Sequence, residues 1–275
     1  MKKAFFILFS VLLAGISCAQ NMERKIVIDH GNYYFTTIHE EFQVATLHVG
    51  KSSEPLKNAK KLALPVGRNY DDPIIPFCWD VRDTSLYAIN FLVHPLNDRN
   101  EALKRLNITQ LKEWTKETTP LSMIMQGTDL NPFAYNEPYA YIIRRSSTLE
   151  DFFFDGIALN DTTYGMAIAN KGELTFWSYN GKSWKHTDVF KFSMKEYFNI
   201  VQHNKKAYLI LSPGTIYEAT SKGIVPVDAK LPGKLTDGIL VVDKDKNTVL
   251  YVKNSDIGPN TSLDEIITKK SKRIF

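Results

Sequence analysis

The sequence contains little cysteine: Cys18 and Cys78 are its two cysteines among 275 residues. Because Cys18 lies in an N-terminal segment that we expect to be removed or lipidated, a single thiol remains and an intramolecular disulfide is excluded. Cys78 stands between Phe77 and Trp79 in an apolar run, which is typical of a buried, unreactive thiol. A hydrophobic core must therefore stabilise the fold, and about 255 residues suffice for one large domain.

The chain also lacks an excess of charge of one sign. It has 34 basic and 30 acidic residues, a formal net charge of +4, and removal of Lys2 and Lys3 with a leader leaves 32 against 30, or +2. This balance argues against nucleic acid as a partner. The basic run at residues 269–273 is too short to change this, and we expect a solvated, frayed end there.

A long apolar run occurs once, at the N-terminus. Two lysines precede an apolar core at residues 4–16, which is the pattern of a secretory signal peptide. Ser17 and Ala19 fit the small-x-small cleavage rule and predict a signal peptide at 1–19 and a mature chain at 20–275. Cys18 offers an alternative as a lipidated cysteine, although the residues before it fit that pattern poorly. We expect export to the periplasm or the extracellular space, without a transmembrane span in the mature chain and tethered only if Cys18 is acylated.

Motifs for metals, cofactors and nucleophiles are incomplete or absent. His39 begins a pattern like the zinc-protease motif, but Gln43 stands where the second histidine is needed. Asp243, Asp245 and Asn247 alternate as the first ligands of a calcium loop do, but the later positions that need Gly and Glu hold Thr and Asn. A solvated hairpin turn is the preferred interpretation. There is no nucleophile elbow, phosphate-binding glycine loop or dinucleotide fingerprint, so no cofactor or metal is predicted.

Short apolar segments separated by polar turns are abundant, above all between residues 164 and 252. Asn180 and Gly181 stand between two of them, which is the strongest short signal for a hairpin because both residues accept a positive φ. The expected strands are 25–29, 33–37, 42–49, 74–81, 86–93, 121–126, 139–144, 152–159, 164–169, 174–179, 182–188, 198–202, 207–211, 216–219, 224–227, 238–242 and 248–252.

This pattern predicts a single, mostly β domain built as a propeller-like stack of short antiparallel sheets. Five or six units of about 40–45 residues would fit the length. A large β-sandwich or a plain meander is the alternative. Residues 50–69 are expected to form a surface loop. Residues 97–117 depart from the pattern, because Leu103, Leu106 and Trp114 recur at roughly helical spacing and predict a small helical insertion.

Carboxylate chemistry is the most serious catalytic hypothesis. A glycoside hydrolase needs two acidic groups on either side of the scissile bond, and these can come from distant strands. Asp80, Glu137 and Asp155 lie near expected strands or in aromatic surroundings and are the catalytic candidates. This makes a propeller-type glycoside hydrolase the alternative function.

Alternating rings and polar groups favour binding over catalysis. Tyr135, Asn136, Glu137 and Tyr139, together with Trp79, combine flat apolar rings with hydrogen-bonding groups, which suits sugars and peptide segments. Packing into the core is the other interpretation of Tyr139 and Trp79. The sequence thus predicts an exported, noncatalytic β module of the bacterial cell envelope that binds a glycan, a peptide or a protein. We expect its functional surface between residues 73 and 155.

Overall fold

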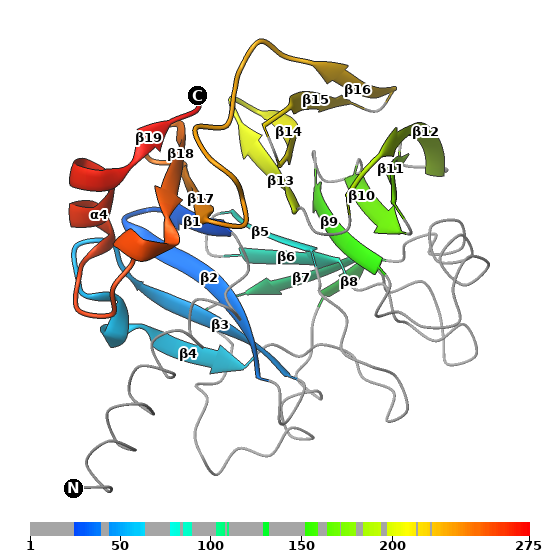
Figure 1. The fold of residues 1–275 in the computed structure, drawn as a ribbon. Helices are drawn as coiled ribbons and strands as arrows, with labels where there is room; N and C mark the ends of the chain where they lie inside the picture. The colour runs from blue at the N-terminus through cyan, green and yellow to red at the C-terminus, as the bar shows by residue number, and fades with distance from the viewer. Residues whose placement is uncertain are drawn as a thin grey trace, which may run out of the picture.

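The computed structural model describes residues 25–39, 44–63, 78–82, 85–89, 103–107, 109, 129–131, 152–158, 164–170, 172–179, 184–193, 197–212, 214–220 and 222–275. Within these ranges the fold is almost entirely β (Figure 1). Its one α-helix among them is α4 (Leu263–Lys270), and η1 (Leu56–Asn58) and η4 (Asn254–Asp256) are short 3-10 turns. The predicted mostly β class is confirmed. No helix of the described part is long and apolar enough to cross a membrane.

The largest sheet joins the two ends of the described chain. Its seven strands have the order β19-β18-β17-β1-β2-β3-β4. Their bounds are β1 (Lys25–Asp29), β2 (Asn32–His39), β3 (Val44–Lys51), β4 (Lys60–Ala63), β17 (Gly238–Asp243), β18 (Thr248–Lys253) and β19 (Lys272–Arg273). β1 runs parallel to β17, with Ile26 opposite Val241, and all other pairs in this sheet are antiparallel.

Three further sheets are four-stranded antiparallel meanders. The first comprises β5 (Cys78–Arg82), β6 (Ser85–Ile89), β7 (Leu103–Asn107) and β8 (Asp129–Asn131). The second comprises β9 (Phe152–Ala158), β10 (Tyr164–Asn170), β11 (Glu173–Tyr179) and β12 (Trp184–Lys191). The third comprises β13 (Phe198–His203), β14 (Lys206–Leu211), β15 (Ile216–Thr220) and β16 (Gly223–Pro226).

The first strands of successive meanders contact one another in chain order. β1 contacts β5, β5 contacts β9, β9 contacts β13 and β13 contacts β17, which pairs with β1. The described strands therefore form four sheets, whereas the sequence predicted five or six separate units. The number differs because the backbone of β1 bonds to that of β17, which merges the first and last meanders into one sheet.

Both faces of the seven-stranded sheet are buried. On one face Ile26 and Ile28 of β1 pack with Leu263 and Ile266 of α4, and on the other Val27 joins the core between the sheets. Complete burial of a Leu or Ile side chain contributes about 1.5–3 kcal/mol. The hydroxyl of Ser262 caps α4 by accepting from the amide of Glu265 at 3.2 Å.

Two tight turns have the backbone geometry that favours hairpins. His30 and Gly31 between β1 and β2 have φ of 51° and 71°, and Asn204 and Lys205 between β13 and β14 have φ of 50° and 60°. Two residues with positive φ match the right-handed twist of the flanking strands.

Three predictions need correction. Inside the predicted helical insertion at 97–117, Leu103–Asn107 is strand β7, because its backbone bonds to β6 and β8. Residues 50–69, predicted as a loop, contain η1 and β4, which extends the sheet beside β3. The basic run at 269–273, predicted to be frayed, ends α4 and forms β19 against β18. The strands expected at 121–126 and 139–144 lie outside the described residues.

Candidate functional site

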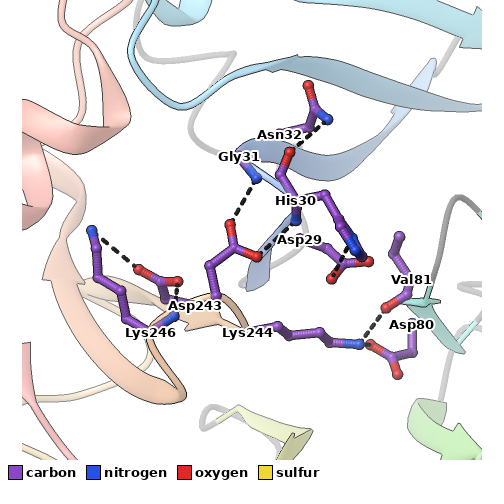
Figure 2. A network of polar contacts seen from close by, with 10 residues as sticks. Asp29, His30, Gly31, Asn32, Asp80, Val81, Asp243, Lys244 and Lys246 are labelled. Atoms are coloured by element: carbon purple, nitrogen blue, oxygen red, sulfur yellow. Dashed lines mark hydrogen bonds and ion pairs between the residues drawn. The ribbon is translucent and has the colours of Figure 1, made fainter.

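Three hairpin turns from two different sheets meet at one place. They are the β1–β2 turn at residues 30–31, the β13–β14 turn at 204–205 and the β17–β18 turn at 244–247. We call these residues the turn junction. Figure 2 shows the part of it around His30 and Lys244. Most of its residues are exposed, so the junction presents a polar surface formed by distant parts of the chain.

Asp245 connects the last hairpin to the first. Its two carboxylate oxygens accept from the backbone amides of His30 at 2.8 Å and Gly31 at 2.7 Å. The side-chain amide of Asn32 donates to the carbonyl of His30 at 3.2 Å on the same turn. Hydrogen bonds from backbone N–H groups to an ionised carboxylate are stronger than neutral ones. One side chain thus fixes both turn residues of β1–β2.

Lys244 connects the same hairpin to the neighbouring sheet. Its Nζ donates to Asp80 Oδ1 at 2.9 Å and also to the carbonyl of Val81 (Figure 2). The two side chains are only 18% and 5% exposed, so this ion pair is largely shielded from water. The backbone amide of Lys244 donates to the carbonyl of Ile28 at 2.9 Å. Lys244 therefore ties β17–β18 to both β1 and β5.

Asp243 holds its own turn. Its Oδ1 accepts from the amide of Lys246 at 2.9 Å, and its Oδ2 lies 3.5 Å from the ammonium of the same lysine. The carboxylates of Asp243 and Asp245 thus bind different protein partners. The ligands of a calcium turn would instead point toward one cation. In the described ranges no group of three or more His, Cys, Asp or Glu residues could hold a metal ion.

Asn247 completes the junction. Its Oδ1 accepts from the amide of Asn204 at 3.4 Å, and its Nδ2 donates to the side-chain oxygen of Asn204. The β13–β14 turn is therefore bonded to the same hairpin that holds β1–β2 and β5.

His30 places an imidazole beside a carboxylate in the β1–β2 turn of the junction. Its side chain is 67% exposed, and its Nδ1 lies 3.3 Å from Asp29 Oδ1. Chemically, the junction offers this imidazole, exposed amide groups and charges of both signs.

His48 is a second unusual histidine, away from the junction. It is buried on β3, where its ring stacks on Phe35 with centroids 4.4 Å apart and its Nε2 lies 2.7 Å from Thr37 Oγ1. Burial, with a smaller contribution from the charge of Lys61, lowers the pKa of His48 to about 4. The imidazole is therefore neutral at physiological pH and serves the fold.

The described structure covers part of the predicted site. Trp79 and Asp80 lie on β5, opposite Ala88 and Tyr87. Asp155 lies on β9, whose strand contacts β5, so two of the three catalytic candidates are on neighbouring first strands. For Trp79 and Asp155 the structure describes the backbone alone. The remaining predicted residues lie outside the described ranges: Cys18, Tyr135, Asn136, Glu137 and Tyr139.

Sequence reasoning missed the roles of Lys244, Asp245 and His30. Asp245 was noticed only as a possible cation ligand, and Lys244 not at all. Each belongs to a polar turn, and polar turn residues are usually solvated, so their composition gave no signal of contacts across the fold.

Comparison with known proteins gives distant matches in structure alone. No protein-family model and no curated protein matches the sequence. The fold resembles apo AztD from Citrobacter koseri with 9% identity and a TM-score of 0.29, and BamB from Moraxella catarrhalis with 11% identity and a TM-score of 0.30. Each match covers 83% of this chain, but only 53% of the AztD chain and 63% of the BamB chain, which is less than two thirds of either. At these TM-scores the similarities identify neither a family nor a function.

Proposed function

We propose that this chain is an exported, noncatalytic β module that binds a glycan, a peptide or a protein partner in the cell envelope. The observation that carries this proposal is the turn junction, where turns of two sheets are bonded into one exposed polar surface. Loops and turns positioned by a rigid β scaffold are the usual location of binding residues.

Three carboxylates near the turn junction already bind groups of the protein, which supports binding over hydrolysis. Asp80, one of the catalytic candidates, is held by Lys244 in a shielded ion pair, and Asp243 and Asp245 hold turn amides. A general acid must exchange its proton with a substrate, and a carboxylate fixed by an ammonium group is poorly suited to do so. The hydrolase alternative then depends on Glu137 and Asp155.

We propose a propeller-like ring of five meanders as the scaffold, with the first and last sharing a sheet. The succession of contacts from β1 through β5, β9 and β13 to β17 supports this arrangement. In such rings the loops at one end of the central strands surround the axis. Of the sequence-predicted ligand residues, Trp79 lies on β5 itself, the first strand of one of these meanders.

Export rests on the signal-peptide pattern at residues 1–19, with Cys18 as the alternative site of lipidation. Mass spectrometry of the protein recovered from expressing cells measures the mature N-terminus. A chain that begins at Gln20 supports cleavage by signal peptidase, a diacylglyceryl mass on Cys18 supports membrane tethering, and an intact Met1 would overturn both.

Binding is tested with the mature chain on glycan and peptide arrays, followed by titration of the best ligand. We expect Asp245→Ala, which releases the β1–β2 turn of the junction, to weaken binding about tenfold or more. Trp79→Ala and Tyr135→Ala should have a similar effect if the sequence-predicted rings belong to the same site. Val225→Ser is the matched control, because Val225 is exposed on β16. The proposal fails if none of these three substitutions changes the affinity. Turnover of an arrayed glycan that Glu137→Gln abolishes would replace it with the hydrolase.

A further inference from the structure

The last four residues of the sequence, 272–275, cover a sheet edge that would otherwise be bare. β18 is bordered by β17 on one side and by the two-residue strand β19 on the other. Residues Val249, Leu250 and Tyr251 of β18 are buried and apolar. An apolar edge strand with unpaired backbone groups is a template for pairing with another chain.

The backbone of the 272–275 segment bonds to this edge as an added strand does. Leu250 faces Arg273 and Tyr251 faces Lys272 in antiparallel register. Beyond this pair, the amide of Ile274 donates to the carbonyl of Val249 at 2.8 Å, and the amide of Phe275 donates to it at 3.3 Å. The amide of Val249 donates in return to the main-chain oxygen of Phe275 at 3.4 Å.

The Phe275 ring anchors the segment on a different sheet. It stacks on His203 with centroids 5.3 Å apart and an interplanar angle of 15°, and it contacts Tyr208 at 4.4 Å. Ile274 and Phe275 are half-buried and pack against the core between the sheets. The segment thus makes main-chain hydrogen bonds to the edge of β18 and an aromatic contact through the Phe275 side chain.

We propose that β18 and the rings of His203 and Tyr208 form a strand-addition site for an extended peptide, and that the 272–275 segment is its intramolecular occupant. Main-chain bonds to a sheet edge supply affinity in such sites, and side-chain pockets supply specificity. The peptide that fits has the sequence of the occupant: two basic residues, a branched aliphatic residue and an aromatic residue. The exposed side chains of Lys272 and Arg273 leave the basic positions in solvent, so the Ile and Phe positions carry the selectivity.

The test uses the full mature chain with Ile274→Ala and Phe275→Ala combined, which removes both apolar anchors. The probe is a fluorescein-labelled peptide of sequence Ser-Lys-Arg-Ile-Phe, and its anisotropy is followed during titration with protein. We expect saturable binding to the double variant and at least about tenfold weaker binding to the wild-type protein, whose own segment occupies the site. A peptide ending in Ile-Ala should lose most of the affinity.

Circular dichroism shows whether the double variant is folded. If it is folded and the peptide does not bind, the proposal is overturned. If it unfolds, Phe275→Ala alone replaces it, because that change keeps Ile274 against the core and removes only the ring that contacts His203 and Tyr208. Absence of peptide binding to this variant would likewise overturn the proposal. Hydrogen exchange of the Val249 amide gives an independent measure: it should quicken in either variant and slow again when the peptide is added.

Discussion

The ammonium group of Lys244 lies 2.9 Å from the carboxylate of Asp80, although the two residues are 164 positions apart in the sequence. The pair links the last hairpin of the seven-stranded sheet to β5, the first strand of the next sheet. Because the same hairpin also holds the β1–β2 and β13–β14 turns through Asp245 and Asn247, it connects three of the four sheets. The consequences for stability can be measured.

Loss of Lys244 should destabilise the fold strongly. Lys244→Met leaves the carboxylate of Asp80 buried without its ammonium partner, and breaking a buried pair in this way costs about 3–5 kcal/mol. Urea denaturation measures the change in the free energy of unfolding. Combining Lys244→Met with Asp80→Asn should recover part of the loss, because the buried group that lost its ammonium partner then carries no charge.

The matched control is Lys246→Met in the same turn, whose side chain is 63% exposed. It should change stability by less than about 1 kcal/mol, as exposed ion pairs contribute little. Equal losses for Lys244→Met and Lys246→Met would contradict the role assigned to the buried pair.

Asp245→Ala should loosen the β1–β2 turn without unfolding the protein. The substitution removes the acceptor for the amides of His30 and Gly31, so their hydrogen exchange should become faster. Asp245→Asn keeps one oxygen acceptor and should have a smaller effect. Amide exchange measured by NMR distinguishes the two variants. Unchanged exchange at both His30 and Gly31 in Asp245→Ala would contradict the role assigned to the Asp245 carboxylate.

The stability of the fold should depend on pH through His48. Its pKa is about 4 in the folded chain against 6.5 for an ordinary histidine, so the unfolded chain binds the proton more tightly. The contribution of neutral His48 is therefore complete above pH 6.5 and is lost as the pH falls from 6.5 to about 4. The full loss is on the order of 3 kcal/mol. Chemical denaturation at several pH values measures it, and His48→Gln should flatten the profile over this interval. A His48 pKa near 6.5 by NMR would contradict the prediction.

Gly238 should not tolerate a side chain. A Cβ at this position would lie 2.5 Å from Tyr251 Cζ and 2.5 Å from the carbonyl oxygen of Val252. The backbone oxygen cannot move without disturbing the β17–β18 pair, so Gly238→Ala should cost about 1–3 kcal/mol. At Gly258 the nearest atom to a new Cβ is Thr261 Oγ1 at 3.5 Å, an ordinary contact. Gly258→Ala should therefore leave the melting temperature nearly unchanged.

Much of the strand content was predictable from local sequence. The expected strands at 25–29, 207–211 and 248–252 agree with β1, β14 and β18 within a residue. Their apolar runs and the polar turns between them act locally, because a turn needs a few residues that accept its φ angles and a strand needs apolar side chains to bury. The exception was Leu103–Asn107, where helical spacing of leucines was outweighed by backbone bonds to β6 and β8.

The sequence by itself determined the mostly β class and the position of most described strands. The tertiary structure decided which strands pair: β1 lies parallel to β17, and the basic 272–275 segment closes the edge of β18. It also decided that Lys244 meets Asp80 and that Asp245 meets the first turn. Strand formation depends on neighbours in sequence, whereas pairing and turn contacts depend on backbone groups and charges brought together only when the sheets assemble.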